Sequence, residues 1–294
     1  MYITVYLLLL APAALAVAAP AVARHLAPAA AVRVLSCLAV IATAATLWAL
    51  CVLVVGGLGR EYADEGSAAL RVADPVPRSV GVLAAVLLTV AVARAVVVRR
   101  QRVAGARLLS AVRLAPAAGE LVVLADDRPD AFALPGRPGR IVVTSGMLGA
   151  LSAGERAVLL AHERAHLRHG HHHYAALADY AAAVNPVLGP LRDLLNYGLE
   201  RWADEEAAAA VNSRALAAIS LARAALATSC RAGRPAGLAY VRHRIGARVE
   251  ALRAQARPSR GRRLWVVAVL AGGTVAALVD TVGALARCVN AMVL

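Results

Sequence analysis

Four long apolar segments dominate the pattern of hydrophobic and polar positions along the chain. They cover residues 2–23, about 34–58, about 79–98 and about 264–286. Each is close to the length of about 20 residues with which an α-helix crosses the hydrocarbon core of a bilayer. Because no basic residue precedes the first segment, we interpret it as an uncleaved span and not as a secretory signal peptide. The pattern predicts a mainly α-helical, polytopic membrane protein with about four transmembrane helices.

Charged residues between these segments predict the orientation in the membrane. The 32 basic residues are all arginine, and the net charge is +14. Arginines crowd the 24–33 link and the stretch after residue 98, whereas the 60–78 loop holds as much acid as base. Because cytoplasmic flanks of transmembrane helices are enriched in arginine, we expect the N-terminus outside and residues 99–262 in the cytoplasm. The expected location is the plasma (inner) membrane, crossed several times.

The composition supports a membrane protein and argues against a nucleic-acid-binding one. Hydrophobic residues make up 60% of the chain and the mean hydropathy is +0.64, too apolar for an ordinary soluble domain. Aromatic residues that could stack on bases are only 4%, and no nucleic-acid-binding motif occurs. The cysteines lack a C-x-x-C spacing, so we expect buried small hydrophobes rather than disulfides or metal ligands at Cys37, Cys51, Cys230 and Cys288.

The expected cytoplasmic region begins with strand patterns and continues into a helix with a readable start. Stretches 121–124, 131–134 and 141–144 predict a hairpin or small sheet, with Pro–Gly turn signals between the last two. Such a sheet could simply pack against the following helix, or its edge could pair with an extended peptide. Ser152 and Glu155 have the spacing of a capping box ahead of an apolar run, which predicts that a helix starts there.

This helix carries His162-Glu163-Arg-Ala-His166, the H-E-x-x-H pattern. Histidines four residues apart lie on one helix face, so both imidazoles can point at one metal ion. Two neutral imidazoles and a carboxylate suit Zn²⁺ and leave a position for water. Glu163 would then be the general base that takes a proton from this water as it attacks a carbonyl. A solvated, histidine-rich helix end is the alternative interpretation.

A carboxylate is needed to complete such a site, and the stretch Tyr197-Gly-Leu-Glu200-Arg-Trp-Ala-Asp204 supplies candidates. It reads as a helix on which Glu200 and Asp204 share a face. We expect Glu200 to be the third ligand, and Asp204 to accept the outward N–H of a ligand imidazole. Glu205 and Glu206 are competing carboxylates, and an acidic, solvated helix face is the alternative.

Other polar clusters are less specific. The run from His169 to His173 suggests a second metal site, but Gly170 is expected to end or loosen the helix, and we interpret the run as a solvated or interfacial helix end. Residues 174–191 are apolar but broken at Asn185-Pro186 and Gly189-Pro190, which argues against a continuous span and leaves a hairpin against the membrane as an alternative. His243 lies in a basic amphipathic segment and is a candidate to stabilise an oxyanion, although a helix facing solvent or lipid headgroups explains it at least as well.

Together, His162-Glu-Arg-Ala-His166, Asn185-Pro186 and Glu200-x-x-x-Asp204 resemble the membrane metallopeptidases of the beta-lactam sensor-transducer (antirepressor) family. Relatives of that family include HtpX-like and CaaX-prenyl-protease-like gluzincins, and residues 132–146 are similar to their strand segment. The resemblance covers about 120–206 closely. It implies that His162, His166 and Glu200 bind zinc, that Glu163 is the general base, and that Asp204 orients a ligand.

The family's arrangement of spans also matches this chain. It implies three transmembrane helices in 1–98, a cytoplasmic zincin-like (minigluzincin) domain with a small β-sheet in 99–262, and a fourth helix with a short tail in 263–294. Only a few residues follow the last apolar segment, so we expect no penicillin-binding sensor domain and no beta-lactam sensing.

Three functional hypotheses result. The first is a zinc-dependent integral-membrane endopeptidase that cleaves a cytoplasmic protein, such as a transcriptional repressor, in a signalling pathway. The second is an HtpX-like protease for quality control of membrane proteins. The third is a membrane signalling protein that binds a metal without catalysis, although Glu163 has little reason to be present except as a base. The expected partners are a protein or peptide substrate and the lipid bilayer, with no nucleic acid.

Overall fold

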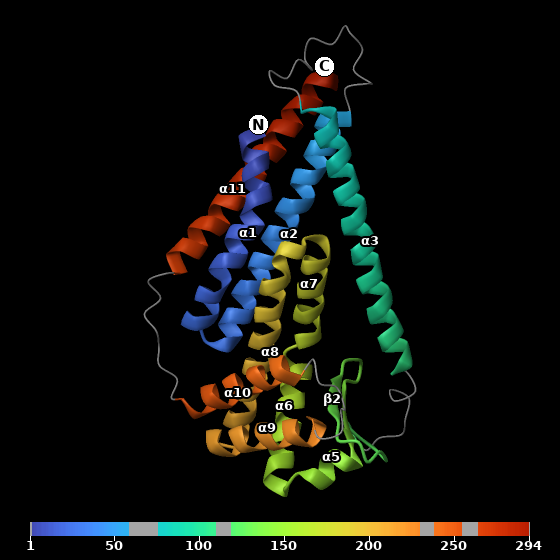
Figure 1. Ribbon diagram of the computed structural model, residues 1–294, viewed down its shortest axis with the longest axis vertical. Coiled ribbons are helices and arrows are strands. Elements are labelled where there is room, and N and C mark those ends of the chain that lie inside the picture. Colours follow the sequence, from blue (N-terminus) through green and yellow to red (C-terminus); the bar gives the residue numbers. More distant parts are fainter. Residues whose placement is uncertain (1, 59–75, 110–118, 230–237, 255–263, 294) are drawn as a thin grey trace. The chain divides into compact units, whose positions relative to one another are not determined.

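The computed structural model describes residues 2–58, 76–109, 119–229, 238–254 and 264–293. The chain is mainly helical and divides into two compact units (Figure 1). Unit 1 comprises Met1–Arg102, Ala176–Leu195 and Ser259–Leu294, and unit 2 comprises Val103–Ala175 and Asn196–Pro258. The mainly α-helical fold class with a small sheet, predicted from the sequence, is confirmed.

Unit 1 is built from long apolar helices: α1 (Tyr2–His25), α2 (Pro28–Leu58), α3 (Arg78–Leu108) and α11 (Leu264–Val293). Within the described residues, stretches Val5–His25, Pro28–Gly57 and Arg78–Leu108 are long and apolar enough to cross a membrane. In α11 the corresponding described stretch, Ala268–Gly283, is shorter, so a fourth span stays a prediction. The orientation across the membrane also stays a prediction.

Small and branched side chains hold these helices together. Helix α1 packs against α2 and α11 around a core that includes Val5, Leu8 and Ala49 (Figure 1). The indole Nε1 of Trp48 donates a hydrogen bond to Thr281 Oγ1 at 2.7 Å, which joins α2 to α11. Small residues allow close helix approach, and such polar links are typical of helix contacts in lipid.

The break expected at Asn185-Pro186 is present. Helix α7 (His171–Val184) ends there, a short 3₁₀ turn η3 (Pro186–Leu188) follows, and α8 (Gly189–Ala210) continues the chain. The side chain of Asn185 accepts a hydrogen bond from the Val187 N–H at 3.1 Å and donates to Thr46 Oγ1 of α2 at 3.0 Å. The tip of this helical hairpin is therefore attached to the apolar helices of unit 1.

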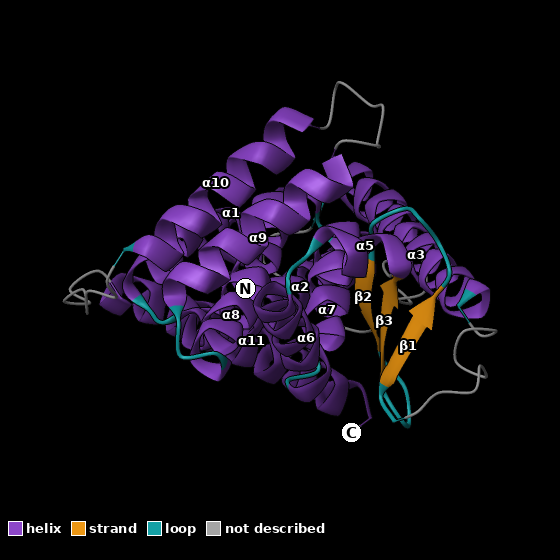
Figure 2. Cartoon of the chain, turned by 90° about the horizontal axis from the view of Figure 1, so that it is seen from below, coloured by secondary structure: helices purple, strands orange, loops and turns teal. Residues whose placement is uncertain are grey.

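Unit 2 contains the sheet and the helices that surround it. Strands β1 (Leu121–Leu124), β2 (Ala131–Leu134) and β3 (Arg140–Thr144) lie where the sequence predicts them, in the order β1-β3-β2 (Figure 2). Strand β3 pairs in parallel with β1 and antiparallel with β2, so β2 is an edge strand. The alternating apolar side chains of β3 pack with α5 (Ser145–Ala150) and α6 (Ala153–Arg168). Helices α9 (Arg214–Ser229) and α10 (Leu238–Arg253) complete the unit.

The expectation of buried cysteines is wrong for the two whose side chains are described. Cys37 and Cys51 are free thiols exposed on the surface of α2. Cys230 and Cys288 lie outside the described side chains. Apolar composition could not distinguish the two cases, because a membrane helix is hydrophobic both where it packs and where it faces lipid.

Candidate metal centre

Helix α6 is fixed at both ends by the local signals in its sequence. The Ser152 N–H donates to Glu155 Oε2 at 2.8 Å, as the capping-box spacing predicts. Glu155 is buried and also pairs with Arg223 of α9 at 2.8 Å. The helix ends at Arg168, and Gly170 adopts a φ of +60° that favours glycine. The two histidines of the H-E-x-x-H pattern therefore lie on a rigid, capped helix.

Three potential ligand atoms converge above this helix. Nε2 of His162 lies 3.2 Å from Nε2 of His166, and the Glu200 carboxylate oxygens lie 3.6 Å from each of them. Zinc–ligand bonds of about 2.0–2.2 Å in a tetrahedron separate neighbouring ligand atoms by about 3.3–3.6 Å. The observed separations therefore fit a single small cation bound by all three groups. A search of the described residues for His, Cys, Asp and Glu side chains close enough together to bind one metal ion identifies this group.

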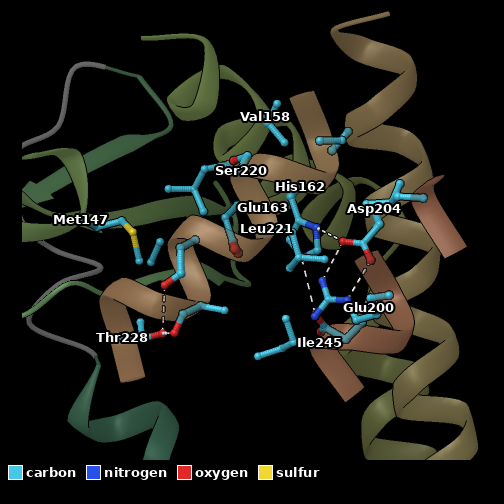
Figure 3. Close-up of a pocket in the computed structure, with 18 of the residues that line it drawn as sticks. Met147, Val158, His162, Glu163, Glu200, Asp204, Ser220, Leu221, Thr228 and Ile245 are labelled. Carbon is cyan, nitrogen blue, oxygen red and sulfur yellow. Dashed lines mark hydrogen bonds and ion pairs between the residues drawn. The ribbon is translucent and has the colours of Figure 1, made fainter. Parts of the chain in front are cut away.

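Asp204 orients the first of these imidazoles. It lies one turn after Glu200 on α8, is 3% exposed, and places Oδ1 3.2 Å from Nδ1 of His162 (Figure 3). A carboxylate at Nδ1 holds the proton there and leaves the Nε2 lone pair free for a metal. The predicted partnership between Asp204 and a ligand histidine is thus present in the geometry.

Arg248 of α10 is a member of the site that the sequence analysis did not single out. Its Nε and Nη2 donate to the Asp204 carboxylate at 2.8 and 2.7 Å, and its Nη1 lies 2.9 Å from Glu200 Oε2. One buried guanidinium therefore holds both carboxylates and offsets their charge. The segment around His243 was recognised as basic, but its pattern gives no indication of which arginine faces the site.

His171 supports the second imidazole, and the interpretation of the histidine run as a solvated or interfacial helix end is wrong for this residue. His171 is 2% exposed, lies against Trp202, and places Nδ1 2.9 Å from Nδ1 of His166. With Nε2 of His166 turned to the metal position, its Nδ1–H donates to His171. The turn at Gly170 redirects the chain so that His171 begins α7 underneath the site, whereas His172 and His173 remain exposed.

The electrostatics of the metal-free site are uneven between the two ligand histidines. Burial disfavours the charged form of His162, but hydrogen bonds to Asp204 and Glu200 outweigh it and raise the pKa to about 10. Burial lowers the pKa of His166 to about 4, so this imidazole is neutral. For Glu200, burial raises the pKa, but His162 and Arg248 hold it below its usual range. Without a metal, a proton on His162 thus supplies the positive charge that the Glu200 and Asp204 carboxylates favour, and a bound cation would replace it.

Glu163 lies beside this centre in a less polar environment. It is 8% exposed, and burial raises its pKa despite the opposing charge of His162 and a hydrogen bond from the Ala133 backbone of β2. Glu163 and His162 line a cavity of about 220 Å³ whose other walls include Leu159, Leu221 and Ile245 (Figure 3). The carboxylate therefore faces a largely apolar cavity next to the metal position and the edge strand.

The structure also separates the candidates that the sequence left open. Glu205 pairs with Arg201 and Arg214, and Glu206 lies 3.3 Å from His169, so Glu200 is the carboxylate at the centre. His243 lies on α10, but its side chain is outside the described residues, and its role stays a prediction.

Comparison with known proteins agrees with this geometry. Residues 98–234 match the family model described as Peptidase family M48. The chain is also similar to a "Protease HtpX homolog" of Acidiphilium cryptum (strain JF-5), with 44% identity over 70 residues, 21% of this chain and 24% of that relative. No solved structure matches the chain significantly. The matched segment contains His162, His166 and Glu200, so the candidate metal ligands lie in a region that is similar to M48 peptidases. The described residues also include helices long and apolar enough to cross a membrane.

Proposed function

We propose that this protein is a zinc-dependent integral-membrane endopeptidase. The observation that carries the proposal is the convergence of His162, His166 and Glu200, whose ligand atoms all lie within 4.8 Å of one another. Two imidazole nitrogens and one carboxylate form the donor set of catalytic zinc sites that keep an open position. Zn²⁺ fits this set better than Mg²⁺ or Ca²⁺, which prefer oxygen ligands in larger number.

The chain's own residues account for the proton movements of peptide hydrolysis. When bound, zinc would polarise the scissile carbonyl and acidify a water. Glu163 accepts a proton from the attacking water, and its raised pKa makes it a stronger base than an ordinary glutamate. The same carboxyl group then returns the proton to the departing amine. Asp204 and His171 hold the two ligand imidazoles in their orientations throughout.

The surroundings of Glu163 suit an extended peptide substrate. Strand β2 lies at the edge of the sheet beside the base, and β-pairing with such an edge is a common way of holding a peptide in register. The adjacent cavity of about 220 Å³ accepts an apolar side chain. We place this site on the cytoplasmic side, on the basis of the arginine distribution between the spans. By the resemblance to sensor-transducer peptidases, a transcriptional repressor is the substrate we propose for a signalling role.

A second candidate function has its own support. The relative named as an HtpX homolog matches a 70-residue segment, so quality control of membrane proteins is equally compatible with the site. The two functions differ in selectivity. Cleavage of one repressor at one bond favours the signalling role, whereas cleavage of many unfolded membrane proteins favours quality control.

The proposed chemistry is tested by comparing Glu163→Gln with His166→Ala in detergent-purified protein. Glu163→Gln should keep its zinc and lose proteolysis of an unfolded substrate such as casein by about 10²–10⁴-fold, the usual contribution of a general base. His166→Ala should lose both metal and activity. If the wild type binds zinc but cleaves neither casein, nor membrane proteins, nor itself, the non-catalytic hypothesis is supported instead.

A further inference from the structure

The apolar stretch of α3 contains a single charged residue. Between Val80 and Val98, the side chain of Arg94 is the one charge. Measured from Arg78, it lies about 24 Å along the helix axis, within the hydrocarbon thickness of about 30 Å, and Arg102 lies about 36 Å along, at the level of the headgroups. An ionisable residue inside a membrane segment is costly and is therefore a sign of function.

Arg94 opens onto a cavity of unit 1, separate from the metal centre. The cavity has a volume of about 350 Å³ and lies between α3, α7 and the start of α8. Three arginines line it, Arg94, Arg102 and Arg192. The rest of its wall is mixed, with Val97, Val98 and two alanines of α7 beside Gln101 and Asp179. It thus combines cationic groups with a hydrophobic surface.

The charges within this cavity are not balanced. Asp179 is the one acidic residue among its described lining, and it pairs with Arg102 at 2.6 Å. Arg94 donates to a neutral group, the Ala182 carbonyl, at 3.4 Å. Arg192 pairs with the neighbouring Asp193 at 3.0 Å, where both side chains are nearly half exposed, so this ion pair is weak. The Nε of Arg102 is buried and has no hydrogen-bond partner among the described residues.

We propose that this cavity binds the phosphate group of an anionic phospholipid. The phosphodiester would lie between Arg94 and Arg102, with Arg192 at the entrance, and the first part of an acyl chain would lie along Val97 and Val98. Arginine is well suited to phosphate because its planar group donates two hydrogen bonds at once. A lipid fits better than free phosphate because Arg94 lies below the headgroup level and part of the wall, Val97 and Val98, is apolar. Basic pockets between membrane helices are known to bind lipid headgroups in this manner.

The test is native mass spectrometry of the delipidated, full-length protein titrated with phosphatidylglycerol, phosphatidylcholine or inorganic phosphate. The wild type should retain one phosphatidylglycerol in preference to phosphatidylcholine. Arg94→Gln/Arg102→Gln should weaken this binding about thirtyfold, since the loss of each hydrogen-bonded arginine costs about fivefold in affinity. The matched control is Arg99→Gln/Arg100→Gln, which removes the same charge from exposed positions of α3 outside the cavity and should bind as the wild type does.

Two results would overturn the proposal. Equal weakening in both double variants would show general attraction to a basic helix end, and displacement of the lipid by millimolar inorganic phosphate would show a site for free phosphate. If Arg94→Gln/Arg102→Gln does not fold, Arg94→Lys/Arg102→Lys preserves the charge. It should keep the preference for the anionic lipid with reduced affinity, and loss of that preference would count against the site.

Discussion

The hydrogen bond from Asp204 to the first ligand histidine gives the sharpest prediction about zinc affinity. In Asp204→Asn the side chain keeps its size and can still accept the Nδ1–H of His162 through its amide oxygen, but it loses the negative charge. At the observed 3.2 Å, the carboxylate stabilises a unit positive charge on the imidazole by about 5 kcal/mol at an effective dielectric constant of about 20, and this charge comes either from a proton or, in part, from a bound cation. Part of the effect cancels, because the lost carboxylate also weakens the binding of the competing proton. Arg248 also offsets part of the stabilisation, because its fork contacts the same carboxylate.

The net effect should therefore be smaller than the direct interaction. We expect zinc affinity to fall about 10–100-fold, or about 1.4–2.7 kcal/mol, as is usual when the partner of a ligand histidine is changed. The assay is competition for Zn²⁺ between the detergent-purified protein and a chromophoric chelator. Glu205→Gln is the matched control, since it removes a charge from the next residue of α8, whose partners are Arg201 and Arg214. Zinc binding by Asp204→Asn that equals the wild type, or an equal loss in Glu205→Gln, would refute the reasoning.

Three further predictions concern the supports of the site. His171→Ala removes the acceptor for His166 and should weaken zinc binding about tenfold, whereas the exposed His173→Ala should not change it. Because the pKa of His162 is raised to about 10 without metal, zinc binding at pH 7–9 should release close to one proton, and zinc affinity should rise with pH until about pH 10. Calorimetry in buffers of different ionisation enthalpy measures the number of protons released, and release of no proton would contradict the prediction. Glu155→Ala removes the capping box and the partner of Arg223, so the free energy of unfolding of the metal-free protein should fall by about 1–2 kcal/mol and its melting temperature should fall with it. An unchanged melting temperature would show that the cap is not needed.

Local signals explain how much of the fold the sequence could predict. The three strands, the helix start at Ser152, the stop at Gly170 and the break at Asn185-Pro186 each depend on neighbouring residues, and all are present in the structure. The pairing of β1 with β3 in parallel could not be predicted in this way, because it joins strands that are not consecutive.

The same distinction holds for the site. His162, His166, Glu200 and Asp204 could be proposed because helical periodicity places each pair on one face. Arg248 could not, since it reaches Asp204 from a helix 44 residues further along the chain. His171 was misjudged because a run of histidines reads as polar, and only the packing against Trp202 shows that its first member is buried.

The most direct test of the central claim is metal analysis of purified protein combined with X-ray absorption at the zinc edge. The wild type should hold one zinc per chain, with two imidazole nitrogens and carboxylate oxygen at about 2.0–2.2 Å and no sulfur. Glu200→Ala should lose most of this zinc, whereas Glu206→Ala should keep it. A wild type that holds no zinc, or Glu200→Ala that retains a full equivalent in an unchanged coordination shell, would contradict the account.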